Sequence, residues 1–191
     1  MNNALSTKEK IVELGRDYIQ KIGYHSFNYK QIATYLDIKN AAIHHYFPSK
    51  DDLAVAVIEK DRQEFITKTQ RLTKDSGTEK LEFLINTYLH FYQDDRKLCL
   101  IGTFCSIYED LSPKIQLSVN QYLDLLNSWL SEVLQQGLNS GELKFDLSVE
   151  EMANSWTASL AGSLQLGRVR GQEYVEKALD ALRRSVKNFK D

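Results

Sequence analysis

Residues 28–53 read NYKQIATYLDIKNAAIHHYFPSKDDL. Apolar residues recur at three- and four-residue steps on both sides of Asp37, which predicts two short helices joined by a turn. Ala33 is small enough for the second helix to cross close by, and aspartate tolerates the left-handed conformation of a tight turn better than most residues. The side chains expected to close the packing are Ile32, Leu36, Ile38, Ile43 and Tyr46. The stretch therefore predicts a helix-turn-helix over residues 29–48.

Helix-start signals recur along the whole chain. Capping boxes, in which Ser or Asn is followed three residues later by Glu, Gln or Asp, stand at residues 6–9, 28–31, 49–52 and 148–151. The segment 97–108 is apolar nearly all round and predicts a buried helix. With only 2 prolines and 9 glycines, the chain has few of the turn residues that a many-stranded sandwich needs. We expect an all-α protein of about nine helices and no strand.

Charge is divided unevenly along the chain. The formal net charge of the 191 residues is −2, which gives no hint of a nucleic-acid partner. Residues 1–50, however, hold seven Lys and Arg against four Asp and Glu, whereas residues 51–191 hold seventeen against twenty-two. This asymmetry favours a basic element that meets a polyanion, carried on an acidic body.

Together with the helix expected before it and the segment Phe47–Leu53 after it, the helix-turn-helix resembles the N-terminal domain of TetR-family transcriptional regulators over residues 7–60. The resemblance implies a DNA-binding domain of three helices, residues 1–50, and a helical effector-binding and dimerisation domain, residues 51–191. In this family the last two helices form the dimer interface, a role that residues 152–189 fit. The implied function is that of a homodimeric transcriptional regulator, most simply a repressor, which leaves its operator when a small-molecule effector binds.

The resemblance also assigns DNA contacts, with double-stranded DNA and a pseudo-palindromic operator as the expected partner. The recognition helix would span residues 39–46, with base contacts from Lys39, Asn40, Ala41 and Ala42. An asparagine amide can bond adenine in two places, and an alanine methyl can pack on that of thymine. Because Lys39 replaces the usual serine or threonine at the helix start, Asn40 is an alternative cap of this helix. Phosphate contacts fall on Asn28, Tyr29, His44, His45 and Lys50.

Aromatic side chains of the body are candidates for an effector pocket, although each also suits an ordinary core. They are Phe65, Tyr88, Phe91, Tyr92, Phe104, Tyr108, Trp129 and Trp156. Two alternatives remain open: a redox- or electrophile-sensing regulator acting through Cys99, and a helical small-molecule-binding protein without DNA activity. Cys99 and Cys105 would lie about 240° apart around a helix, which disfavours a disulfide switch between them.

Several protein classes lack support in the sequence. We find no paired acidic motif, glycine-rich phosphate loop, nucleophile elbow or HExxH motif, so we expect no enzyme, no cofactor and no metal site. No apolar run approaches the roughly 18 residues that span a membrane, and no apolar signal segment follows Met1. With two cysteines at an unsuitable spacing for a disulfide scaffold, the expected location is the cytoplasm.

Overall fold

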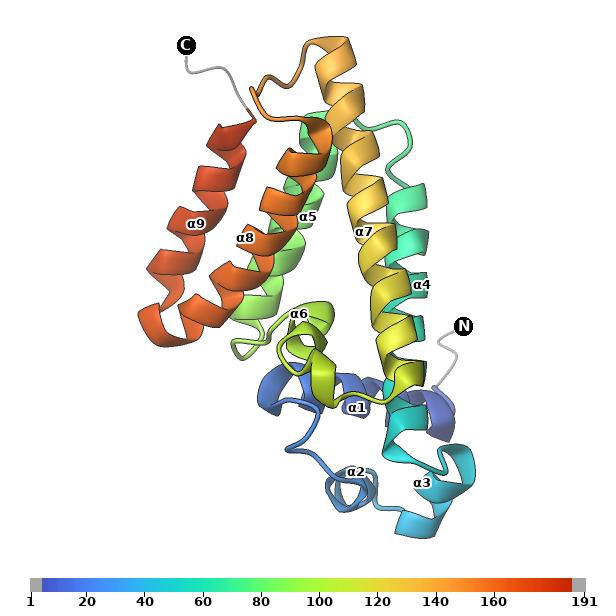
Figure 1. Cartoon of the computed structure of the whole chain (residues 1–191). Coiled ribbons are helices and arrows are strands. Elements are labelled where there is room, and N and C mark those ends of the chain that lie inside the picture. Colours follow the sequence, from blue (N-terminus) through green and yellow to red (C-terminus); the bar gives the residue numbers. More distant parts are fainter. Residues whose placement is uncertain (1–4, 187–191) are drawn as a thin grey trace. The chain divides into compact units, whose positions relative to one another are not determined.

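The computed structural model describes residues 5–186, and within this range it is helical with no strand (Figure 1). The all-α prediction is therefore confirmed. No helix among these residues is long and apolar enough to cross a membrane. The helices are α1 Thr7–Ile22, α2 Tyr29–Leu36, α3 Asn40–Tyr46, α4 Lys50–Gln70, α5 Gly77–Gln93, α6 Leu100–Cys105, the 3-10 helix η1 Tyr108–Asp110, α7 Pro113–Ser140, α8 Val149–Arg170 and α9 Gln172–Ser185.

The helices form two compact units. The first contains residues 5–64 and 100–122, and the second contains residues 65–99 and 123–186. Helices α4 and α7 each contribute turns to both units. The functional division at residue 50 stays a prediction, and residues 187–189 of the expected dimer segment lie outside the described residues.

The first unit packs around α1, whose predicted capping box forms as expected. The Ser6 amide donates to Glu9 at 2.8 Å, and the Glu9 amide donates to the Ser6 hydroxyl at 3.3 Å. Helix α6 packs against α1, and the Phe104 ring lies 5.7 Å from that of Tyr24 between ring centres. The segment 97–108 is buried over residues 99–104 as predicted, but α6 has only six residues because the backbone turns after Cys105.

A largely buried ion network joins three helices of the first unit. The Arg16 guanidinium of α1 pairs with Asp61 of α4, and its Nη1 lies 3.0 Å from Glu64 Oε2. The Tyr122 hydroxyl of α7 donates to Asp61 Oδ2 at 2.9 Å. Burial alone would lower the pKa of Arg16, but the carboxylates of Asp61 and Glu64 raise it above its ordinary value.

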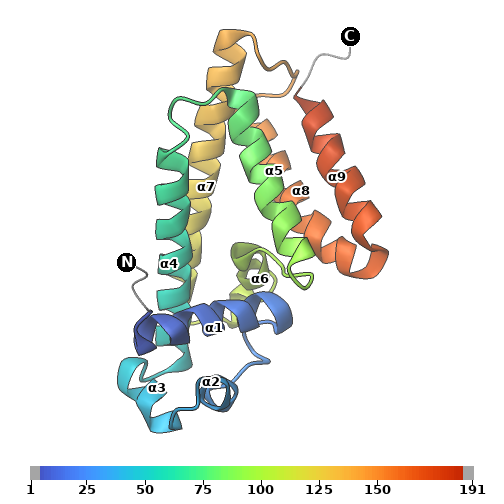
Figure 2. The ribbon, with the colours of Figure 1, turned by 180° about the vertical axis from the view of Figure 1, so that it is seen from behind.

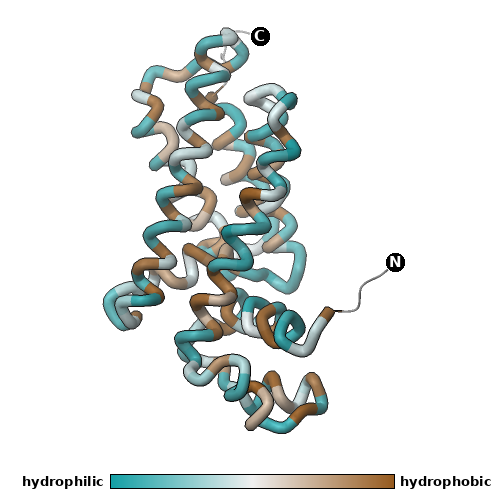
Figure 3. The backbone as a smooth tube through the Cα atoms, turned by 90° about the vertical axis from the view of Figure 1, so that its right-hand side faces the viewer, coloured by the Kyte–Doolittle hydropathy of each residue, from teal (hydrophilic) through white to brown (hydrophobic). Residues whose placement is uncertain are grey.

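The second unit is built from α5, α8, α9 and the later part of α7 (Figure 2). Apolar (brown) and polar (teal) residues alternate along the helical tube of Figure 3, as expected of helices with one buried side. Trp156 of α8 is fully buried and donates to the Ser185 hydroxyl of α9 at 3.1 Å. The loop before α8 is held against α5, because Glu142 accepts from the Gly77 amide at 2.9 Å and the Thr78 amide at 2.8 Å.

Candidate nucleic-acid interface and effector region

The turn between α2 and α3 has the geometry that the sequence predicts. Asp37 adopts φ 52° and ψ 49°, the left-handed conformation. The Ile38 amide donates to the Ala33 carbonyl at 3.0 Å, which closes the turn after α2. Ala33 is buried, as expected for the residue at a helix crossing. Residues 29–46 therefore form a helix-turn-helix.

Helix α3 presents the predicted base-contacting residues. Lys39 is the residue before its first turn and provides no side-chain cap, and Asn40 is the first helical residue. The alternative that Asn40 caps the helix is therefore wrong. Asn40 is exposed and its side-chain amide makes no hydrogen bond within residues 5–186, while Ile43, three residues further along the helix, is fully buried. Ala41 is exposed and Ala42 is half-buried.

Three of the predicted phosphate contacts occupy different environments. Asn28 is exposed and caps α2, accepting from the Gln31 amide at 3.2 Å. Tyr29 is buried, and its hydroxyl lies 2.6 Å from the Ser49 carbonyl and 3.0 Å from that of Phe47. Burial, with the nearby carboxylates, raises the pKa of Tyr29 to about 12. His45 is exposed. The Tyr29 hydroxyl thus holds α2 to the segment after α3.

His44 lies against Tyr29, with the two ring centres 4.9 Å apart. Its Nδ1 is 3.4 Å from the Pro48 carbonyl, and since a carbonyl only accepts, Nδ1 carries the proton in this contact. A phosphate oxygen also only accepts. His44 therefore donates to a phosphate while keeping this contact only when the imidazole is doubly protonated.

Lys50 packs within the first unit. Its ammonium lies 4.5 Å from the ring centre of Phe27 and 4.8 Å from that of Tyr24, and donates to the His25 carbonyl at 3.3 Å. Burial lowers the pKa of Lys50. The side chain therefore holds the loop between α1 and α2 in place, a role that the sequence pattern did not reveal.

Tyr46 departs from the sequence prediction. It was expected to close the packing of the helix-turn-helix, but its side chain is 40% exposed, and its ring lies 5.3 Å from that of His45. The next residue, Phe47, is buried instead. Helical period alone could not distinguish these two neighbours, because α3 ends between them.

The start of α4 is fixed by a capping box and an ion pair. Asp52 accepts from the Ser49 amide at 2.9 Å and from its hydroxyl at 2.6 Å, as the predicted box requires. Lys114 in the first turn of α7 donates to Asp52 at 2.6 Å. These hydrogen bonds, from Lys114 first and then Ser49, lower the pKa of Asp52 to about 2.

The eight aromatic candidates for an effector pocket are divided between the two compact units. Phe104 and Tyr108 belong to the first compact unit, and the other six belong to the second. There Phe65 packs edge-on against Trp129 with ring centres 5.4 Å apart. Tyr92 donates to the Gly167 carbonyl at 2.9 Å. These contacts are those of a packed core, and which of these side chains contact an effector stays a prediction.

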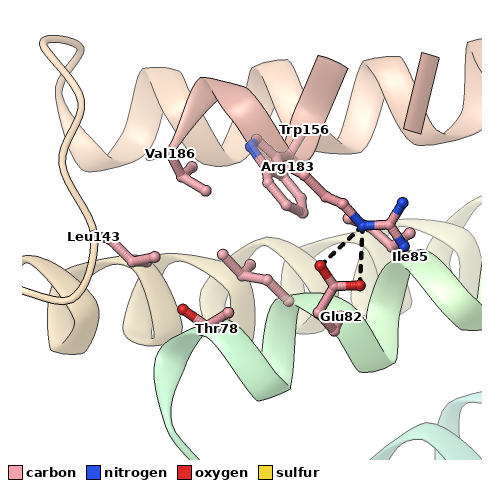
Figure 4. A pocket seen from close by; sticks show the side chains of 8 residues that line it. Thr78, Glu82, Ile85, Leu143, Trp156, Arg183 and Val186 are labelled. Carbon is pink, nitrogen blue, oxygen red and sulfur yellow. Dashed lines mark hydrogen bonds and ion pairs between the residues drawn. The ribbon is translucent and has the colours of Figure 1, made fainter. Parts of the chain in front are cut away.

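A small cavity opens between α5, α8, α9 and the loop before α8 (Figure 4). Trp156 lines it, together with the ion pair between Arg183 Nε and Glu82 at 2.8 and 3.0 Å. Its volume of about 10 Å³ is room for about one water molecule. This cavity therefore does not fit a drug-sized ligand.

The two cysteines are thiols that do not form a disulfide. Cys99 is buried immediately before α6, and a buried cysteine usually behaves as a small apolar side chain. Cys105 is exposed at the end of α6, and partial burial of its thiol raises its pKa, which disfavours the reactive thiolate. No group of three His, Cys, Asp or Glu in residues 5–186 could hold a metal ion.

Comparison with known proteins identifies the family. Residues 11–57 match the model for bacterial regulatory proteins of the tetR family. The crystal structure of a TetR transcriptional regulator from Legionella pneumophila is 31% identical, covers 98% of this chain and 100% of its own, and superposes with a TM-score of 0.86. The chain belongs to the TetR family.

Two further comparisons extend over most of the chain. The fatty acid metabolism regulator protein of Bacillus subtilis strain 168 is 26% identical over 145 residues, 73% of this chain and 72% of that protein. A structure of the transcriptional regulator FadR from Bacillus subtilis in complex with stearoyl-CoA shares the fold, with a TM-score of 0.70 at 19% identity over 93% of this chain and 98% of the other. This TetR-family protein is a transcriptional regulator with a DNA-binding helix-turn-helix, and the thiol-sensing and DNA-free alternatives are not favoured.

The Asp52 contacts predict a pH-dependent stability. We expect Asp52→Asn to lower the free energy of unfolding by about 1 kcal/mol at pH 7, because the charge-assisted hydrogen bonds from Ser49 and Lys114 are weakened. Because the folded-state pKa of about 2 is below the ordinary 3.8, this contribution is complete above about pH 4 and is lost as the pH falls toward 2. Urea denaturation at several pH values measures it.

The matched control is Asp146→Asn, which changes an exposed aspartate of the loop before α8 and should leave stability unchanged at each pH. A gap between wild type and Asp52→Asn that stayed constant from pH 6 to pH 2.5 would show that the charge of Asp52 does not matter.

Proposed function

We propose that this TetR-family regulator is a homodimeric repressor that binds a pseudo-palindromic operator and leaves it when a small-molecule effector binds. The observation that carries the DNA-binding part is the start of α3, where Asn40 is exposed and unbonded within residues 5–186 while Ile43 is buried. The buried Ile43 side chain fixes the helix on the rest of the DNA-binding domain. The first residues of the helix are then available to contact base edges. Lys39, Ala41 and Ala42 would complete the base contacts.

The phosphate contacts would come from groups flanking α3. Asn28, His44 and His45 are exposed and suited to this role. We propose that Tyr29 contacts a phosphate through its backbone amide, since its hydroxyl already donates to the Ser49 carbonyl. Lys50 would contribute mainly by holding the loop before α2.

Dimerisation through α8 is supported by an exposed apolar strip. Leu166 is 52% exposed and Val169 is 82% exposed. Leu166 follows Gly162 by four residues and Val169 follows Leu166 by three, so the three residues lie on one side of α8. A Cβ at Gly162 would have no neighbour within 4 Å, so this part of α8 offers room for the close approach of another helix. If two protomers paired at this strip about a two-fold axis, their DNA-binding domains would bind successive major grooves about 34 to 36 Å apart.

The effector would bind in the body, the proposed domain of residues 51–191. Stearoyl-CoA is the first compound to test, because a protein of the same fold is described in complex with it and a fatty acid metabolism regulator is a sequence relative. Helices α4 and α7 contribute turns to both compact units, so a change in the second unit can reach the start of α4 along the chain. By linkage, effector and operator must weaken each other's binding equally.

A fluorescence-anisotropy titration against DNA from upstream of the protein's own gene, beside a coding fragment, tests the proposal. We expect tight binding to the upstream fragment that falls steeply with salt, and release on addition of stearoyl-CoA. Coenzyme A without an acyl chain is the matched control. Equal weak binding to both fragments, and to DNA selected from a random pool, would contradict the function.

Asn40→Ala tests the proposed base reader. We expect discrimination to relax by roughly 1 to 3 kcal/mol at one base pair of each half-site, with the other positions unchanged, because a single bidentate amide contact is lost. Binding to a set of operators with single base changes measures this effect. Asn86→Ala, an exposed asparagine on α5, is the control. A uniform loss across all operator variants would instead assign Asn40 a structural role.

Val169→Glu tests the proposed dimer interface. A carboxylate buried in an apolar interface is strongly unfavourable, so we expect a monomer in analytical ultracentrifugation and an operator affinity lowered by about 100-fold, as two-site binding is lost. Leu117→Glu, at a side chain of α7 that is 59% exposed, is the matched control. A Val169→Glu protein that remained dimeric would exclude this face.

A further inference from the structure

Lys8 is a cation placed where helix stability alone disfavours it. It lies in the first turn of α1, where the unpaired backbone amides attract acids such as Glu9 and repel an ammonium. The side chain is exposed, and its Nζ lies 5.9 Å from the ring centre of Phe47. Because Phe47 is buried and follows the last residue of α3, this contact holds the ammonium beside the carboxyl end of the recognition helix.

The basic side chains of the first unit fall into two groups. Those that form ion pairs with carboxylates are Arg16, Lys21, Lys60 and Lys114. Those that form none with any residue from 5 to 186 include Lys8 and Lys10 on α1. An ammonium without a carboxylate partner can neutralise a DNA phosphate, which releases a cation condensed on the DNA.

Lys8 is also close to the other groups suited to phosphate contact. Helices α1 and α3 pack against each other, and both ribbon views show the first turn of α1 on the side of the unit where α3 lies (Figure 1, Figure 2). The last turn of α3 exposes His44 and His45. Lys8 therefore adds an ammonium to the end of α3 at which His44 and His45 are exposed.

We propose that Lys8 of each protomer binds a DNA phosphate beside the major groove that receives α3. The proposal rests on the proposed function and extends its DNA interface beyond residues 11–57, the part of the chain that matches the family model. The first residues of a recognition helix read base edges, so the far end of α3 and its neighbour Lys8 face the flanking sugar-phosphate backbone. Such a contact carries no sequence information and contributes affinity and register.

Lys8→Met tests this contact, because methionine keeps an aliphatic chain over Phe47 and removes only the charge. Lys10→Met is the matched control: it removes the same charge from an exposed position about 200° around the same helix. Wild type and both variants are titrated by fluorescence anisotropy, between 50 and 300 mM KCl, against DNA that the wild type selects from a random pool. Circular dichroism checks that all three are folded.

We expect Lys8→Met to lower the slope of log affinity against log salt by about 0.9 per protomer, and affinity at 0.1 M salt by about eightfold per lost contact. Lys10→Met should leave the slope unchanged, and Lys8→Arg should restore it. If Lys8→Met and Lys10→Met behave alike while the wild type binds its selected DNA, the Lys8 contact is wrong and the proposed function stands. If the wild type selects no DNA, the proposed function itself fails.

Discussion

The pairing of Arg16 with Asp61 is the interaction on which the first unit depends. Both side chains are largely buried, and a buried charge is tolerated only when an opposite charge and hydrogen bonds replace its water. Asp61 has a second partner, the Tyr122 hydroxyl, so one carboxylate connects α1, α4 and α7. Removing any one of these partners would leave a buried polar group without a hydrogen bond, which is costly in free energy. Few other arrangements of these three helices would avoid this cost. The pair therefore selects one geometry more than it adds stability.

The position of α1 in turn determines what α3 can present. Ile11 and Ile19 of α1 and Ile43 of α3 are all fully buried. The Tyr29 hydroxyl bonds the backbone just after α3, which fixes α3 from its other end. With its apolar side and its carboxyl end both held, α3 has only its first residues and one flank for DNA. The exposure of Asn40 is thus a result of burial elsewhere, as expected of a site carried on rigid elements.

In the proposed effector-binding domain, the sequence pattern does not distinguish a packed core from a ligand pocket. Aromatic residues in a helical pattern satisfy a core and a ligand pocket equally well, since both require large apolar surfaces. In the second unit, Trp156 and Tyr92 each use their polar atom to hold another helix or its carbonyl. The Arg183 guanidinium beside Trp156 is paired with Glu82, and the cavity that these residues help to line has room for about one water molecule. Composition and period cannot say which aromatic residues leave a void, because a void depends on how several helices meet.

The sequence by itself determined the elements and the turn. Capping boxes, helical period and the aspartate at position 37 act over three to seven residues, and for this reason the all-α architecture and the left-handed Asp37 were predictable from the chain alone. Only the tertiary structure decided that Lys50 packs on two rings, that Tyr46 faces outward and that the Asn40 amide is unbonded within residues 5–186. Each of these depends on residues far apart in the chain or on where a helix stops, and burial there is a collective result of packing that no local pattern records.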